Sequence, residues 1–213
     1  MSPMPKPANQ TNRSLLVALG SLAAILVVVA GALLYVLSRS HDKGSTVAAP
    51  IGGPFSLTDQ NGQPVTDQTY AGHFRLIYFG YTFCPDACPT ELQVMAQAVD
   101  LLGSDAAKVQ PIFITVDPAR DTSKQLAGYV PLFDKRLVGL TGTPQQIAQV
   151  AREYKVYYAK ADAANGDPNA YAMNHSSFVY LMAPDGKFLT VFSSDTDADK
   201  MAQEIKRYMR GVA

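Results

Sequence analysis

The chain has 213 residues, a formal net charge of zero, 47% hydrophobic residues and no tryptophan. This composition excludes an intrinsically disordered chain, and it lacks the basic excess that a nucleic-acid-binding protein would carry. We therefore expect a folded protein without a nucleic-acid partner.

The amino-terminal part of the chain contains one long apolar run, from Leu15 to Leu37, without a charged side chain. At about 1.5 Å per helical residue, this run is long enough to cross a bilayer core of roughly 30 Å. The alternative is a cleaved signal peptide, but the apolar region of such a peptide is usually about 7 to 15 residues long. The sequence favours an uncleaved transmembrane helix over residues 15–37 that contacts the lipid bilayer.

The charges that flank this run do not decide its orientation, because Lys6 and Arg13 precede it while Arg39 and Lys43 follow it. A short tail without acidic residues is easily retained in the cytoplasm, so we expect residues 1–14 inside and the following domain outside. In a bacterium, this predicts a single-pass protein of the inner membrane with its soluble domain in the periplasm.

The remainder divides into a tether and one domain. Residues 38–53 are small and polar and show no periodicity, which is typical of a tether. Residues 54–213 form the predicted domain. About 160 residues bury roughly 70% of their unfolded surface, so such a domain needs no disulfide to hold its core.

The domain begins with a predicted hairpin, because Asn61-Gly62 is a strong turn signal between two short extended runs. Beyond it, extended apolar runs alternate with runs of helical spacing. The predicted strands are 75–80, 109–116, 137–140, 156–159, 176–182 and 187–193, and the predicted helices are 90–102, 123–129, 143–154 and 195–210.

This alternation of strands and helices ends in an antiparallel hairpin and a last helix. The pattern predicts an α/β fold with a central mixed sheet flanked by helices. We expect a thioredoxin-like arrangement, with a turn-rich excursion over residues 162–174.

The only two cysteines, Cys84 and Cys88, lie between a predicted strand and the helix that follows it. If that helix begins near Pro85, residues four apart share one face, and both sulfurs converge at its first turn. The free N–H groups and the helix dipole are then expected to lower the thiol pKa below about 8.5. Two thiolates cannot complete a structural zinc site, whereas Cu(I) accepts two soft ligands and one histidine. A redox disulfide stays open as the alternative.

Three histidines are available as a further ligand. His41 lies in the tether. His73 precedes the strand 75–80, at the end opposite the cysteines. His175 ends the turn-rich excursion, where a thioredoxin-like topology brings it against the helix after the cysteines. His175 is therefore the favoured ligand, and a loop histidine bonded to the backbone is the alternative.

Two acidic residues lie next to these candidates. Asp86 stands between the cysteines and is expected to cap the start of the helix, or else to tune the thiolates. Asp117 follows a strand at the carboxyl edge, where sites lie in open α/β sheets. It is either a hydrogen-bond acceptor near a metal, or it only fixes a turn and caps the next helix together with Asp121 and Arg120.

Several of these segments together resemble the Sco/SenC family of membrane-anchored copper proteins for cytochrome oxidase assembly. The similarity covers nearly the whole soluble domain and rests on linked motifs in the family's order. They are FGYTFCPDACPT at 79–90, FITVDPARDT at 113–122, LVGLTGT at 137–143, VYY at 156–158, and His175 followed by YLMAPDG at 180–186.

The resemblance implies a thioredoxin-like fold in which Cys84, Cys88 and His175 bind one copper ion per domain, as Cu(I) and with Cu(II) left open. It implies a periplasmic copper donor and delivery to the binuclear copper site of cytochrome c oxidase subunit II. The alternative is a thiol-disulfide reductase that acts on the cysteines of that subunit, so whether the chain is an enzyme stays open. The family commonly has an acidic residue where this chain has Asn174. Asparagine keeps the hydrogen bond and loses the charge, so an electrostatic role beside the metal is in question there.

Overall fold

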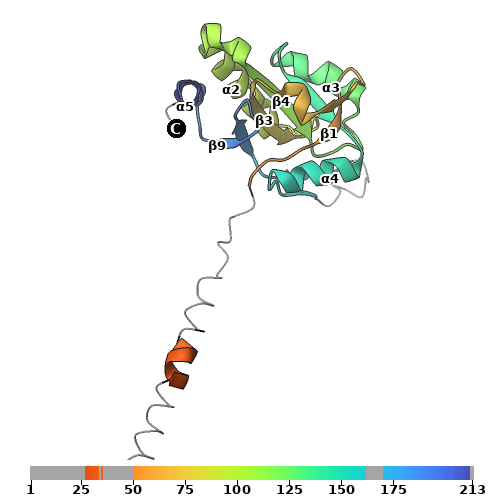
Figure 1. Cartoon of the computed structure of the whole chain (residues 1–213). Helices are drawn as coiled ribbons and strands as arrows, with labels where there is room; N and C mark the ends of the chain where they lie inside the picture. Colours follow the sequence, from red (N-terminus) through yellow and green to blue (C-terminus); the bar gives the residue numbers. More distant parts are fainter. Residues whose placement is uncertain (1–26, 34, 36–49, 162–169, 212–213) are drawn as a thin grey trace, which may run out of the picture. The chain divides into compact units, whose positions relative to one another are not determined.

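The computed structural model describes residues 27–33, 35, 50–161 and 170–211, and the chain divides into the units Met1–Ala49 and Pro50–Ala213. In the first unit, residues 27–33 and 35 are helical (Figure 1). The rest of the predicted span 15–37, the predicted tail and most of the tether lie outside the described residues. No helix within the described ranges combines the length and the apolarity needed to cross a bilayer. The transmembrane helix therefore stays a prediction.

The second unit begins with the hairpin that its Asn-Gly pair predicts. Strand β1 (Ser56–Asp59) pairs antiparallel with β2 (Pro64–Thr66). In the turn, the Asp59 carboxylate accepts hydrogen bonds from the backbone N–H groups of Asn61 and Gln63, both at 2.8 Å. Gly62 has a φ of +77°, which glycine adopts without a steric penalty. A short 3-10 helix, η1 (Asp67–Tyr70), follows.

Seven strands form one mixed sheet in the order β2-β1-β5-β4-β3-β8-β9. Its centre is parallel, with β4 (Val109–Thr115) between β3 (Phe74–Gly80) and β5 (Val138–Thr141). Antiparallel strands complete both sides. β1 pairs with β5, β8 (Phe178–Met182) pairs with β3, and β9 (Phe188–Ser193) pairs with β8. The predicted mixed sheet and its closing antiparallel hairpin are confirmed.

Among the described residues of the second unit, four helices pack around this sheet. They are α2 (Ala87–Leu101), α3 (Ser123–Tyr129), α4 (Pro144–Glu153) and α5 (Ala198–Met209), with short 3-10 helices η2 (Gly103–Lys108) and η3 (Val130–Leu132). Helix α4 lies on the opposite side of the sheet from α2 and α3 (Figure 1), and α2 packs against α5. The predicted flanking of the sheet by helices is thereby confirmed.

Capping residues explain where two of the helices begin. Helix α4 begins one residue later than predicted, because Thr143 and Gln146 form a reciprocal capping box, with Pro144 at the first position. Helix α5 begins three residues later than predicted, because Asp197 accepts a hydrogen bond from the backbone N–H of Lys200 and caps it.

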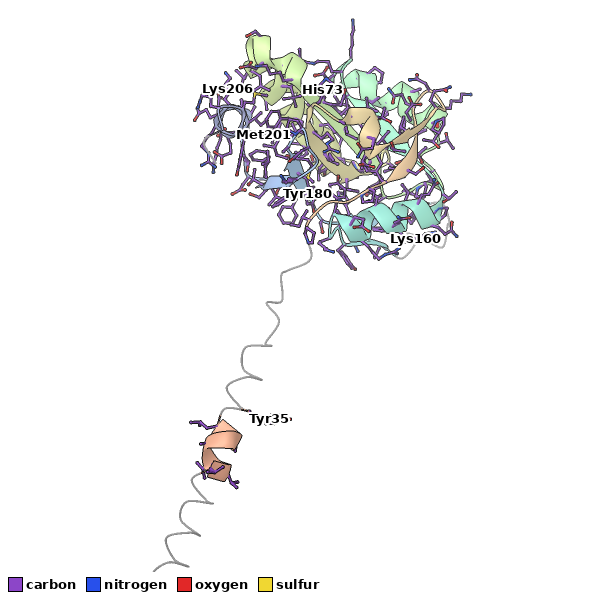
Figure 2. All side chains as sticks on the ribbon, in the orientation of Figure 1. Tyr35, His73, Lys160, Tyr180, Met201 and Lys206 are labelled. Carbon is purple, nitrogen blue, oxygen red and sulfur yellow. The ribbon has the colours of Figure 1, made fainter. Side chains whose placement is uncertain are left out.

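The core lies between the sheet and the helices. Residues 76–79 of β3 and 112–114 of β4 are fully buried, which explains their continuous apolar sequence, since helices cover both faces. Tyr180 on β8 extends the core through edge-on ring contacts with Phe79 and Tyr154, at centroid distances of 5.9 and 5.7 Å. Figure 2 marks Tyr180 together with Met201, a buried residue of α5.

A separate two-stranded sheet carries the predicted metal-binding histidine. Strand β6 (Tyr158–Lys160) pairs antiparallel with β7 (Met173–His175), and Tyr158 is opposite His175. The predicted strand 156–159 therefore pairs outside the main sheet. Residues 162–169 of the predicted excursion, including Asn165-Gly166, lie outside the described residues.

Candidate metal centre

The two cysteines lie in the connection from β3 to α2. Helix α2 begins at Ala87, so Cys84 precedes the helix and only Cys88 lies in its first turn. The helix thus begins two residues after Pro85, the start that the sequence suggested. The sulfurs still approach each other, because the backbone N–H of Cys88 points at the Cys84 sulfur, with an N···Sγ distance of 3.4 Å. Both thiols are free.

Gly80 makes room for the sulfur of Cys88. A Cβ atom at this position would lie 2.9 Å from Cys88 Sγ and 2.9 Å from the ring of Phe113, closer than real Cβ contacts allow. Cys88 is consequently fully buried at the end of β3, while Cys84 is half-buried. The more accessible thiol of the pair is therefore Cys84.

His175 reaches the same place from β7. Its Nε2 lies 3.5 Å from Cys88 Sγ, and its Nδ1 lies 3.1 Å from the carbonyl oxygen of Ser176. If Nδ1 carries the proton, it donates to that carbonyl and leaves the lone pair of Nε2 facing the sulfur. The rings of Tyr78 and Tyr81 meet the imidazole edge-on, at centroid distances of 6.1 and 5.9 Å, and fix its plane.

The distance between Cys88 and His175 suits two ligands of one metal ion. With metal–sulfur and metal–nitrogen bonds of about 2.3 and 2.0 Å, two such ligands stand roughly 3.5 to 3.7 Å apart. The observed 3.5 Å lies in this range. As they stand, however, no three of the described histidine, cysteine, aspartate and glutamate side chains form a group that could hold a metal ion.

Burial dominates the electrostatics of the site. Desolvation raises the pKa of Cys88 to about 12, and the neighbouring Cys84 adds to this increase. The prediction of a lowered thiol pKa is therefore wrong for Cys88. Burial also lowers the pKa of His175 below 6.5, against the opposing effect of its bond to Ser176. Both groups are thus neutral near pH 7 in the metal-free protein.

The structure also tests the predictions made for the residues near the cysteines and for the other histidines. Asp86 stands at the N-cap position of α2, but its carboxylate makes no capping hydrogen bond, so the capping prediction is wrong. Asn174 is exposed and pairs with Ala159 in the β6–β7 hairpin. His73 (Figure 2) lies just before β3, at the end opposite the cysteines, and His41 lies outside the described residues.

Asp117 connects the two segments that carry the candidate ligands. Its carboxylate accepts hydrogen bonds from Arg120 Nε at 2.5 Å and from the Tyr171 hydroxyl at 2.9 Å. The Arg120 guanidinium stacks on the Tyr171 ring at 3.6 Å and lies 4.7 Å from the ring of Phe83. Asp117 also fixes the turn after β4, whereas Thr122, not Asp121, caps α3. Asp117 and Arg120 therefore hold the histidine hairpin next to the cysteine loop.

Asp121 has a role that the sequence did not reveal. It is fully buried and accepts hydrogen bonds from Thr82 N at 2.9 Å, Thr82 Oγ1 at 2.6 Å and Thr115 Oγ1 at 2.6 Å. These bonds fasten the cysteine loop to the end of β4. No local pattern marks such a long-range contact, because Asp121 lies in the polar segment 117–124, where a carboxylate is ordinarily exposed to water.

With this geometry in place, the chain can be compared with known proteins. The SCO1/SenC family model matches residues 43–210. The human protein called SCO1 homolog, mitochondrial, is 44% identical over 162 residues, which are 75% of this chain and 53% of the human protein. The chain therefore spans about half the length of that relative.

Two solved structures are also similar. The copper-bound structure of ScoI from Bradyrhizobium japonicum is 46% identical, with a TM-score of 0.68, and the match covers 74% of this chain and 99% of the other. BsSco, described as having a disulfide switch and as a member of the Sco family of cytochrome c oxidase assembly proteins, is 26% identical, with a TM-score of 0.58 over 75% and 93% of the two chains. Fold, motifs and family model agree, and the chain belongs to the SCO1/SenC family.

Proposed function

We propose that this chain is a membrane-anchored copper carrier. It binds one copper ion through the thiolates of Cys84 and Cys88 and the imidazole of His175, and delivers the ion to the binuclear copper site of cytochrome c oxidase subunit II. Residues 15–37 anchor it in a bacterial inner membrane, and the folded domain receives copper in the periplasm from a donor protein. The family membership and the copper-bound relative support this proposal.

The single observation that carries the proposal is the contact between Cys88 and His175. Two soft or borderline donors from distant parts of the chain lie 3.5 Å apart, and the sulfur of Cys84 lies beside the backbone N–H of Cys88. Two thiolates and one imidazole suit Cu(I), which accepts low coordination numbers and soft ligands. Cys84 is the third ligand of the proposed set.

The protein's own groups prepare the site for exchange of the ion. His175 is already neutral, and its bond to Ser176 directs Nε2 towards the sulfur. The buried thiol of Cys88 keeps its proton in the metal-free protein. It releases this proton when the copper cation binds to the sulfur. Cys84 is half-buried and is the ligand that an incoming thiolate of the acceptor reaches first.

A second function is favoured by the proximity of the two free thiols. In a thiol-disulfide exchange, Cys84 would attack a disulfide of subunit II and release one of its sulfurs as a thiol. Cys88 would then displace the second sulfur and close a Cys84–Cys88 disulfide, so that two electrons and two protons pass to the partner. The disulfide switch described for BsSco is compatible with such a step.

The test is a Cu(I) titration of the reduced full chain against a competing chelator. We expect one Cu(I) per chain, binding lost in Cys84→Ala and Cys88→Ala, and weakened binding in His175→Ala. His73→Ala is the matched control, since His73 lies at the other end of β3. If His175→Ala binds Cu(I) and Cu(II) as tightly as His73→Ala does, the proposed ligand set is wrong.

A further inference from the structure

A cleft of about 240 Å³ opens beside the first turns of α2, next to the candidate metal centre. Its lining is acidic and hydroxylated, and no basic side chain is among the described residues that form it. The polar lining residues are Tyr78, Asp86, Thr90, Glu91, Ser177 and Ser194.

Glu91 is the unusual member of this set. It follows Cys88 by three residues and shares the buried face of α2 with Leu92 and Met95. Only 5% of its surface is exposed, and in the described part of the chain its Oε1 has no hydrogen-bond partner. A desolvated acceptor without a donor costs about 1 to 3 kcal/mol. Burial accordingly raises the pKa of Glu91 to about 7.

The floor of the cleft contains a second polar group without a well-formed bond. Tyr78 is fully buried, and its hydroxyl lies within reach of Cys88 and Ser177 but makes no hydrogen bond of good geometry within the described residues. The cleft therefore presents a carboxylate oxygen and a hydroxyl oxygen that a ligand with N–H donors would satisfy together.

The chemistry of the lining selects the kind of ligand. The carboxylates of Asp86 and Glu91 favour a cation, and an organic cation suits the site better than a metal ion. The described residues provide no third histidine, cysteine, aspartate or glutamate in a metal-holding group here. At about 30 Å³ per water molecule, the volume corresponds to roughly eight waters, which is room for a charged head group and part of its methylene stem.

We propose that this cleft binds the ammonium or guanidinium group of a lysine or arginine side chain from the protein that exchanges copper with the cysteine pair. The inference rests on the proposed function, since it assumes a protein partner at the cysteines. Asp86 lies between Cys84 and Cys88 in the sequence and lines the cleft, so a protein that covers the cysteine loop also covers the cleft. A basic side chain inserted there pairs with Glu91 and sets the position of the acceptor over Cys84.

The experiment follows the Glu91 side-chain carboxyl by NMR in the reduced, copper-free full chain in nonionic detergent. The probes are n-butylammonium and n-butylguanidinium, titrated at constant ionic strength. We expect saturable shifts of the Glu91 carboxyl signal and of the Tyr78 ring signals. In Glu91→Gln, we expect the shifts at Tyr78 to need about tenfold more probe, since a hydrogen bond to a charged group contributes about 1.5 to 3 kcal/mol.

Three controls make this result decisive. Asp199→Asn, an exposed acidic residue of α5, should bind the probes as the unaltered chain does. Neutral n-butanol should produce no saturable shift, and Mg²⁺ should not displace the ammonium probe. The inference is overturned if the shifts do not saturate, if Glu91→Gln and the unaltered chain respond alike, or if n-butanol or Mg²⁺ occupies the cleft.

The outcome is separable from that of the proposed function. The Cu(I) stoichiometry of the same unaltered preparation is measured in parallel. Absence of Cu(I) binding would refute the copper site and leave the cation cleft standing, whereas one bound Cu(I) without probe binding would refute the cleft alone.

Discussion

The buried carboxyl of Glu91 predicts a stability that depends on pH. Its pKa rises from 4.5 to about 7 in the folded protein, while the unfolded chain keeps the ordinary value. Between these two values the unfolded chain releases a proton that the folded protein holds, so the free energy of unfolding decreases as the pH rises. Since one pKa unit corresponds to about 1.4 kcal/mol, the full decrease is about 3 kcal/mol, complete above pH 7.

The substitution Glu91→Gln isolates this effect. Glutamine keeps the shape and does not titrate, so the stability of the variant relative to the unaltered chain should increase by about 3 kcal/mol between about pH 4.5 and pH 8. His175 acts in the opposite direction, because its lowered pKa costs stability as the pH falls below 6.5. It is present in both proteins and cancels in the difference.

The assay is urea unfolding of the reduced, copper-free full chain at several pH values, followed by tyrosine fluorescence. Asp199→Asn is the control and should give a flat difference, because Asp199 is exposed. A stability difference for Glu91→Gln that does not change with pH would show that Glu91 ionises as freely as an exposed carboxyl. The account of its burial would then be refuted.

Three further predictions concern the cysteine loop. Asp121→Ala removes an acceptor of three hydrogen bonds and should cost at least about 3 kcal/mol in urea unfolding. A loss below about 1 kcal/mol, the range expected for Asp199→Asn, would contradict its structural role. Gly80→Ala should destabilise the fold by about 1 to 3 kcal/mol and weaken Cu(I) binding about tenfold, because the new methyl group displaces the Cys88 sulfur. Gly128→Ala, which adds a methyl group in open space, should do neither, and equal behaviour of the two variants would refute the packing argument. Finally, Cu(I) affinity should rise about tenfold per pH unit for each thiol proton released between about pH 6 and pH 8. The unaltered chain should release two such protons, and a slope of one proton or less would mean that Cys84 and Cys88 do not both bind as thiolates.

Much of the fold followed from local patterns in the sequence. The apolar run that ends at Gly80 predicted β3, and the Asn61-Gly62 pair predicted the first turn. Both are decided by neighbouring residues, since alternation, continuous hydrophobicity and turn propensity are local properties. The order of strands and helices then limited the topology to a mixed sheet, with helices on both faces.

The electrostatics of the site could not be predicted in the same way. A helix terminus stabilises a charge by about 0.3 to 1 kcal/mol, whereas full burial can shift a pKa by several units. The first effect is visible in the sequence around Cys88, and the second depends on Gly80, Tyr78 and Phe113 packing around the sulfur. The burial of Glu91 could not be predicted either, because only the tertiary structure shows whether a carboxylate on a helix is exposed or buried.

The proximity of Cys88 and His175 was less predictable from the sequence than the fold, and more predictable than the electrostatics. The two residues are separated by 86 intervening positions, and no local pattern joins them. Their meeting was expected because a thioredoxin-like topology brings that loop against the helix after the cysteines, and because the resemblance to the Sco/SenC family implies it. In the structure, Cys88 Sγ and His175 Nε2 lie 3.5 Å apart. The contacts among Asp117, Arg120 and Tyr171 explain how the β6–β7 hairpin is held next to the cysteine loop.

X-ray absorption at the copper edge of the copper-loaded full chain tests the central claim most directly. Coordination by Cys84, Cys88 and His175 predicts two sulfur neighbours at about 2.3 Å and one nitrogen neighbour at about 2.0 Å. In His175→Ala the nitrogen neighbour should disappear while both sulfurs stay. A single sulfur neighbour in the unaltered protein, or an unchanged nitrogen neighbour in His175→Ala, would contradict the proposed metal centre.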